Sequence, residues 1–157
     1  MITSFTVHKA RVYNEVAKTT SYAGAKKSPD GLAYEHAFTK DEDRIMLERF
    51  WNEAANIVTN VFKPFIVSVS STEQAHDMDL ERNYVAELSL PGSFDKTLVN
   101  SIESSLFSFF TNFVVSRWYE FIDDEETKKF ESDAAAMIED VRAKIYFRKK
   151  PQRIAPQ

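Results

Sequence analysis

The sequence predicts a mainly α-helical fold, a four-helix bundle that carries one β-hairpin. In four long segments the apolar residues recur at steps of three and four, the spacing of one helix face. Two shorter runs alternate between apolar and polar residues, as half-buried strands do. The length of 157 residues fits a single domain. We expect this domain to span residues 1–147, with the hairpin at about residues 65–90, and an extended basic tail to follow at residues 148–157.

The first predicted helix follows a short extended segment. Phe5 and Val7 alternate with polar residues, which indicates an extended backbone before the helix. The helix is expected over about residues 9–23, from the spacing of four apolar residues: Val12, Tyr13, Val16 and Ala17. Glycine, serine, proline and aspartate are concentrated in residues 24–31, a composition typical of a loop.

The second predicted helix has the clearest helical pattern in the chain. Thr39 is a candidate N-cap, and the acidic residues 41–43 follow in the first turn, where negative charge favours the helix dipole. The apolar stripe consists of Leu47, Phe50, Trp51, Ala54, Ile57, Val58, Val61 and Phe62. Pro64 cannot easily continue a helix, so we expect the helix to end at about Lys63. The alternative is that Pro64 only kinks the helix, which then continues toward Ser70.

Two alternating runs make up the predicted hairpin. The apolar residues are Phe65, Val67 and Val69 in the first run and Tyr84, Ala86, Leu88 and Leu90 in the second. The polar and mostly acidic residues 72–82 connect the two runs. Two isolated strands are only marginally stable in water, so we expect the hairpin to pack on the helices or to pair with another chain.

The third predicted helix runs from Asp95 to about Ile122 and is apolar around more than one face. Such a helix lies at the centre of its domain or is buried against a neighbouring subunit. Two interpretations stay open: an ordinary core helix between the other three, or an oligomer interface along one edge, where aromatic residues are enriched. The candidate interface residues are Phe107, Phe110, Arg117 and Trp118.

The fourth predicted helix covers about residues 126–147 and follows a run of acidic residues at 123–126. Its apolar stripe consists of Phe130, Ala134, Met137, Ile138, Val141 and Ile145. The tail beyond it contains two prolines, so we expect an extended chain there.

The formal net charge of −4 is the sum of three unlike parts. Residues 1–30 carry five basic and two acidic side chains, and residues 140–157 carry six basic and one acidic side chain. The segment between them carries nine basic and twenty-one acidic side chains. An acidic body with two basic ends is typical of a chain whose ends bind other molecules.

The tail holds the candidate partner-binding residues. Basic residues near the C-terminal end of a helix complement the helix dipole. For Arg142 and Lys144, this role and a role in binding a partner are equally good explanations. The helix dipole explains the cations of the tail less well, because they flank or follow Pro151 and so are expected to lie outside the last helix. These candidates are Arg148, Lys149, Lys150 and Arg153. They could bind nucleic-acid phosphate or an acidic patch of another protein, such as a neighbouring copy, and we favour the protein partner.

The composition argues against several chemistries. With no cysteine and three glycines, the chain has no thiolate metal site, disulfide or glycine-rich phosphate loop. The sharpest metal candidate, His76 with Asp77 and Asp79, is better explained as a solvated acidic loop. We therefore expect no catalytic residue, metal or cofactor. The most apolar run, residues 106–115, is too short to span a membrane, so we expect no membrane partner.

The helix pattern resembles that of small phage head–tail connector proteins, adaptors that form a ring beneath the portal. The resemblance lies in the acidic helix start at residues 39–43 and in the stripe that follows: Leu47, Phe50, Trp51, Ala54 and Val58. The segment from Ala17 to Ala54 is also similar to uncharacterised proteins of Bacteroides phages and prophages. Members of the connector family are mostly helical, often with a β-hairpin, and use an extended terminal tail to grip a neighbour or the portal. The very aromatic third helix departs from the better-known adaptors.

The resemblance implies a structural, non-catalytic virion protein that forms a homo-oligomeric head–tail connector ring. Its partners would be other copies, the portal, and tail or other neck proteins. DNA would pass through the ring without specific binding, which suits an acidic body. Its location would be the virion neck, and the host cytoplasm during assembly. The alternative is a cytosolic nucleic-acid-binding or regulatory helical protein.

Overall fold

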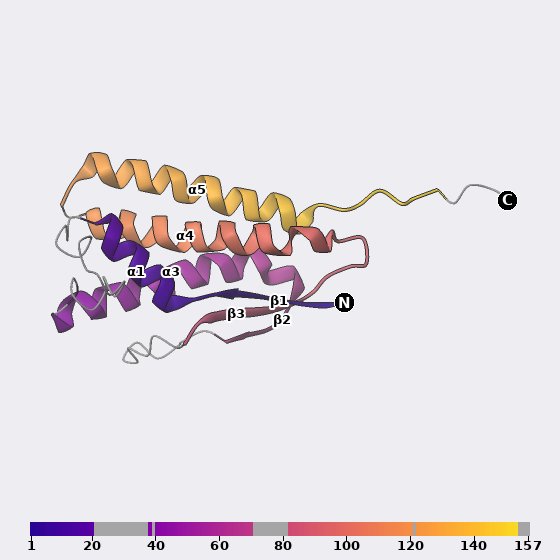
Figure 1. Ribbon diagram of the computed structural model, residues 1–157, viewed down its shortest axis with the longest axis horizontal. Coiled ribbons are helices and arrows are strands. Elements are labelled where there is room, and N and C mark those ends of the chain that lie inside the picture. The colour runs from indigo at the N-terminus through magenta and orange to yellow at the C-terminus, as the bar shows by residue number, and fades with distance from the viewer. Residues whose placement is uncertain (21–37, 39, 71–81, 121, 154–157) are drawn as a thin grey trace.

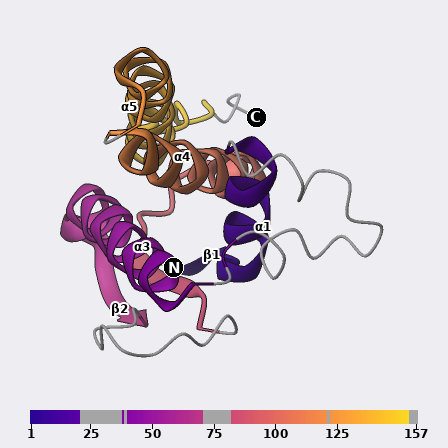
Figure 2. The ribbon, with the colours of Figure 1, turned by 90° about the vertical axis from the view of Figure 1, so that its left-hand side faces the viewer.

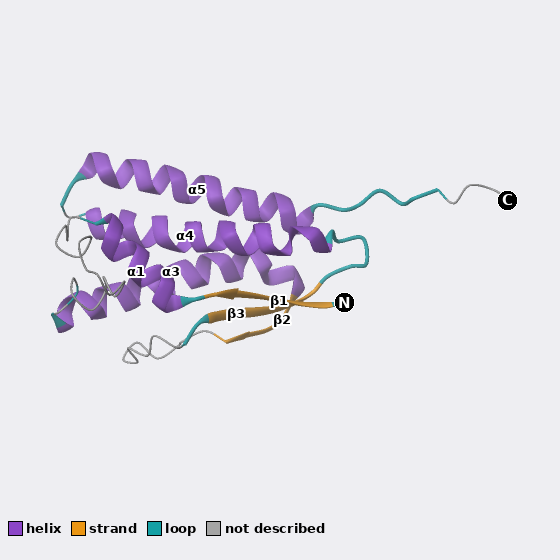
Figure 3. Cartoon of the chain, viewed as in Figure 1, coloured by secondary structure: helices purple, strands orange, loops and turns teal. Residues whose placement is uncertain are grey.

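Four α-helices and a small three-stranded antiparallel sheet make up the described part of the chain, which confirms the predicted mainly helical fold class. The computed structural model describes residues 1–20, 38, 40–70, 82–120 and 122–153. Figure 1 shows the sheet along one side of the molecule, with the helices stacked above it. Figure 3 shows the same view by secondary structure and makes the long extended C-terminal segment visible.

Helix α4 (Val99–Tyr119) is the central element of the fold. Helices α1 (Lys9–Thr19), α3 (Asp41–Phe62) and α5 (Asp124–Tyr146) all pack against it, and α5 packs mainly on α4. The end-on view shows α5 on the far side of α4 from the sheet, with α1 and α3 on opposite flanks (Figure 2). Because its neighbours surround it, α4 buries apolar residues around most of its circumference.

The sheet contains one more strand than the predicted hairpin. The strands are β1 (Ile2–Val7), β2 (Ile66–Ser70) and β3 (Tyr84–Ser89), in the order β1-β3-β2, and both pairs are antiparallel. The segment expected to be only an extended lead-in is therefore an edge strand, and it pairs with β3 along its whole length. The third strand and the helices that pack against the sheet together stabilise the hairpin, which would be only marginally stable by itself.

One face of the sheet is buried against the helices and the other is polar. The buried side chains are Phe5, Val7, Tyr84, Ala86 and Leu88. On the outer face, the Ser68 hydroxyl donates to the Glu87 carboxylate over 2.9 Å. An irregularity between Ile66 and Ser68 shifts the register of β2. The prediction that Phe65, Val67 and Val69 share one strand face is therefore wrong, because Phe65 precedes the strand and Val67 is 53% exposed.

Pro64 ends a helix, as predicted, and does not kink it. After α3 the chain makes a short 3-10 turn at Lys63–Phe65 and then enters β2. At the other end of α3 the acidic residues 41–43 fill the first turn, as expected from the helix dipole. Lys40 is at the N-cap position, so the predicted cap at Thr39 is wrong by one residue, and Thr39 itself lies outside the described residues.

The other helix limits differ from the predictions by a few residues. Helix α1 ends at Thr19, and residues 21–23 of the predicted helix lie outside the described residues. Asp95 caps a 3-10 turn at Lys96–Leu98 that leads into α4, accepting a hydrogen bond of 3.0 Å from the Thr97 N–H. Asp123 caps α5 and accepts backbone hydrogen bonds from the following turn.

No helix in the described ranges is both long and apolar enough to cross a bilayer. Beyond α5, residues 147–153 form neither helix nor strand and extend away from the body.

Candidate interaction site

Arg148, the first cation of the tail, caps helix α5. Its guanidinium donates to the carbonyl oxygens of Ile145 and Phe147 over 2.8 and 2.9 Å. These carbonyls belong to the end of the helix, where partners from the helix itself are missing. The same guanidinium lies 5.7 Å from the ring centre of Phe65, which precedes β2. Arg148 therefore complements the dipole at the end of α5, a role that the sequence favours less for the tail than for Arg142 and Lys144.

Lys149 fastens the start of the tail to the loop before α4. Its backbone N–H donates to the Ser93 carbonyl oxygen over 2.8 Å, and its ammonium lies 3.4 Å from Asp95 Oδ1. Hydrogen bonds from the Thr97 side chain and backbone, and then from Lys149, lower the pKa of Asp95 from its usual value. We call Arg148 and Lys149 the anchor residues, because both contact the body of the same chain.

The remaining two predicted cations lie beyond this anchor. Lys150 and Arg153 are exposed, and the described structure shows no ion pair between them and any other described residue. We call residues 150–153 the arm. Figure 1 shows the arm leaving the end of α5 and continuing away from the body. The four candidate partner-binding residues therefore divide into two that fix the direction of the tail and two that are available to a partner.

The four candidate interface residues of α4 do not form one surface. Phe110 is fully buried, with its ring centre 4.5 Å from that of Trp51 and 5.7 Å from that of Tyr84. It belongs to the core, so its prediction as an interface residue is wrong. Trp118 packs edge-on against Phe38 at 5.2 Å. Phe107 is half-buried on another side of the helix.

Phe107 lines a pocket of about 330 Å³ between the first strand and α4. Glu103, on the preceding turn of α4, also lines it and accepts a hydrogen bond of 3.0 Å from the Thr6 N–H. His8 and Arg11 form the other wall. Of the aromatic residues of α4, Phe109 and Phe110 are buried within the fold, and Phe107, Phe113 and Trp118 are half-buried.

Arg117, the fourth candidate, links α3 and α4 at the edge of a groove. Its guanidinium lies 3.1 Å from Glu53 Oε2 of α3 and donates to Glu120 Oε2 over 2.8 Å. It also lies 5.9 Å from the ring centre of Phe50. Arg117 therefore has two carboxylate partners within the same chain.

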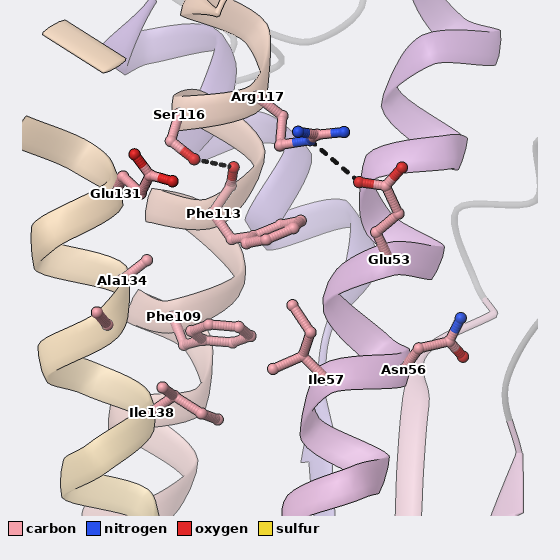
Figure 4. Close-up of a pocket in the computed structure, with 11 residues that line it drawn as sticks. Glu53, Asn56, Ile57, Phe109, Phe113, Ser116, Arg117, Glu131, Ala134 and Ile138 are labelled. Carbon is pink, nitrogen blue, oxygen red and sulfur yellow. Dashed lines mark hydrogen bonds and ion pairs between the residues drawn. The ribbon is translucent and has the colours of Figure 1, made fainter. Parts of the chain in front are cut away.

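A groove beside Arg117 runs between α3 and α5 over α4. It encloses about 590 Å³. In Figure 4 the rings of Phe109 and Phe113 and the side chains of Ile57 and Ile138 point into it from the three helices. We call this hollow the groove; its charged lining residues are Glu53, Arg117 and Glu131.

Sequence reasoning did not find the groove, because its residues come from three separate helical stripes. Ile57 and Ile138 are apolar positions of ordinary amphipathic helices, and nothing local marks them as neighbours of an open space. The groove exists because α5 packs mainly on α4, which leaves α3 and α5 apart. Ala135 lines the groove on the side of α5 and is exposed, and its small side chain leaves the groove open there.

A polar cluster joins α4 and α5 near their other ends. Ser105 Oγ donates to Asp140 Oδ2 over 2.6 Å, and Lys144 Nζ donates to Ser101 Oγ over 2.7 Å and forms an ion pair with Asp140. Hydrogen bonds from Lys144 and Ser105 lower the pKa of Asp140. This cluster links α4 to α5 through contacts that the sequence pattern did not indicate.

Among the described residues, no group of three or more histidine and acidic side chains is placed to hold a metal ion. The candidate at His76, Asp77 and Asp79 lies outside the described residues. Comparison with known protein families, with curated proteins and with solved structures finds no match to this chain.

Proposed function

We propose that the protein is a structural, non-catalytic subunit of a homo-oligomeric ring, the head–tail connector between the portal and the tail in a virion neck. The observation that carries this proposal is the anchored tail. Arg148 and Lys149 fix its first residues to the body, so that the exposed Lys150 and Arg153 extend beyond the subunit. A segment held in this way has less conformational freedom to lose when it binds a partner.

The charge distribution supports a protein partner for the arm. The segment 31–139 holds nine basic and twenty-one acidic side chains, so a second copy offers the arm a surface of opposite charge. A contact between the end of one copy and a different surface of the next is heterologous. Heterologous contacts generate rings when the rotation between copies closes.

The acidic body also supports the role of the ring as a passage. DNA repels a surface with an excess of carboxylates, so a channel framed by such subunits would not retain the DNA that passes through it. In this proposal the other partners are the portal, tail or other neck proteins, and the site of action is the virion neck after assembly in the host cytoplasm.

The mass of the assembled state tests the proposal. Native mass spectrometry and negative-stain microscopy of the full-length protein should show closed rings, and a K150E/R153E variant should not form them. This variant leaves both anchor residues in place, so its circular dichroism and unfolding transition should match those of the unmodified chain. A full-length protein that stays monomeric up to high concentration would contradict the proposal.

A nucleic-acid-binding role is the second candidate, because Phe147 is 51% exposed next to the cations of the tail. An exposed aromatic ring beside basic residues can stack on a base while the cations contact phosphates. With two cations in the arm, the affinity for single-stranded DNA should fall with salt with a logarithmic slope of about −1.4. Fluorescence anisotropy over a salt series measures this slope, and no binding at low salt rejects the role.

A further inference from the structure

We propose that the groove of one subunit binds the arm of a second copy of this chain. This inference rests on the proposed ring and names the contact that would build it. The groove lies beside the middle of α5, and the arm follows the anchor residues beyond the end of this helix, so one subunit carries both halves of a head-to-tail contact.

The direction of the arm separates it from the groove of its own subunit. Ala135 lines the groove, and α5 continues from there to Tyr146, a distance of about 17 Å at 1.5 Å per residue. The hydrogen bond from the Lys149 N–H to the Ser93 carbonyl oxygen then directs the chain onward from that end. Figure 1 shows the arm continuing away from the helices, so it presents its cations to another molecule.

The charges around the groove match those of the arm. Among the described lining residues Arg117 is the one cation, and Glu53 and Glu120 both lie within 3.1 Å of its guanidinium. Glu131, on the opposite wall, adds a further carboxylate. The mouth of the groove therefore keeps a net negative charge, which favours the cations Lys150 and Arg153.

The shape of the groove suits a short extended peptide. A volume of about 590 Å³ falls within the range of sites that enclose a small ligand or a few side chains. Its floor is apolar, with Phe109 and Phe113 facing inward. The arm contains Pro151, which restricts the backbone to an extended form and so lowers the entropy lost on docking.

Disulfide cross-linking between two kinds of subunit tests this contact directly, because the chain has no cysteine of its own. One variant carries A135C, in the groove wall, and the other carries Q152C, in the arm and between its two cations. Both substituted residues are exposed, so neither change disturbs the core. The matched control is A136C, since Ala136 is also exposed on α5 but is not among the lining residues of the groove.

We expect mixing A135C with Q152C under mild oxidation to yield a covalent heterodimer. Docking would hold the two thiols at an effective concentration near the millimolar range, so the yield should exceed that of A136C with Q152C by about tenfold. Equal yields with A135C and with A136C would overturn the proposal. Faster closure within a single diluted A135C/Q152C chain would also overturn it, because the occupant would then be the tail of the same subunit.

The outcomes separate this inference from the proposed function. Rings that form without the A135C–Q152C cross-link overturn the inference and leave the connector ring standing. A cross-link that forms between copies that never close into rings supports the tail contact and overturns the connector ring.

Discussion

Lys9 and Glu48 form an ion pair inside the core, where their side chains are 0% and 1% exposed. The pair joins the first turn of α1 to the middle of α3. The Tyr13 hydroxyl donates to Glu48 Oε1 over 2.9 Å, and the Lys9 ammonium lies 5.6 Å from the ring centre of Tyr13. Buried charges of this kind are tolerated only when they are paired.

Removing the charge of Glu48 should therefore destabilise the fold strongly. The E48Q variant leaves the Lys9 ammonium buried without a counter-ion, and we expect the free energy of unfolding to fall by about 3–5 kcal/mol. Urea unfolding followed by circular dichroism measures the change.

The same chemical change at an exposed pair is the control. Glu139 lies 3.4 Å from Arg142 on α5, and both side chains are at least half exposed. The E139Q variant should lose less than about 1 kcal/mol. Equal losses in E48Q and E139Q would show that the buried pair is not important for stability. A K9M/E48L variant, which removes both charges, should recover much of the stability lost in E48Q.

Features with a local cause could be predicted from the sequence. The acidic run at 123–126 indicated the start of α5 because Asp123 caps the helix through the Glu125 and Glu126 N–H groups. Pro64 indicated the end of α3 because proline cannot donate the next helical hydrogen bond.

Features that depend on distant parts of the chain could not be predicted. Phe5 of β1 lies opposite Ala86 of β3, and no local pattern shows that the two segments meet. On α4 more than one face is apolar, so spacing could not tell that Phe110 is buried while Phe107 is only half-buried. The anchor was missed for the same reason, because Ser93 lies far from Lys149 in the sequence.

Stability should depend on pH through Asp140. Lys144 and Ser105 hold the pKa of this carboxyl below its usual 3.8 in the folded state. A lowered folded pKa means that the contribution of Asp140 to stability is complete above 3.8 and is lost as the pH falls through the folded pKa. Urea unfolding at several pH values between 5 and 2 should show this loss. In D140N the slope over this acid range should be smaller, and an unchanged slope would contradict the assignment.

The anchor and the arm should respond differently to substitution. R148A removes the hydrogen bonds to the carbonyl groups of Ile145 and Phe147, so we expect a loss of about 1 kcal/mol in unfolding free energy. K150A removes an exposed cation of the arm and should change stability by less than about 0.5 kcal/mol. Urea unfolding of the two variants compares these values directly. Equal losses in the two variants would mean that the tail is not divided into an anchor and an arm.

Copies with complementary defects should stop at a dimer when they are mixed. In A135K the groove is blocked by a lysine side chain, whereas K150A/R153A has an intact groove and an arm without cations. Each variant should assemble about thirtyfold more weakly than the unmodified chain, because the altered half no longer attracts its partner. In the mixture, the arm of A135K can still enter the groove of the other variant. That single contact cannot propagate, so native mass spectrometry should show a heterodimer of two 18.1 kDa chains and no larger species.

The control for this mixture is A136K, which adds the same charge to α5 outside the groove. It should assemble on its own like the unmodified chain, since its groove and arm are both intact. If A136K did not assemble, the effect of A135K would be due to the added charge and not to a blocked groove. A mixture that stays monomeric would show that the arm and the groove do not bind each other. A heterodimer in the mixture, together with normal assembly of A136K, requires that each subunit use two different surfaces. Such a contact is heterologous, and it is the kind from which rings are built.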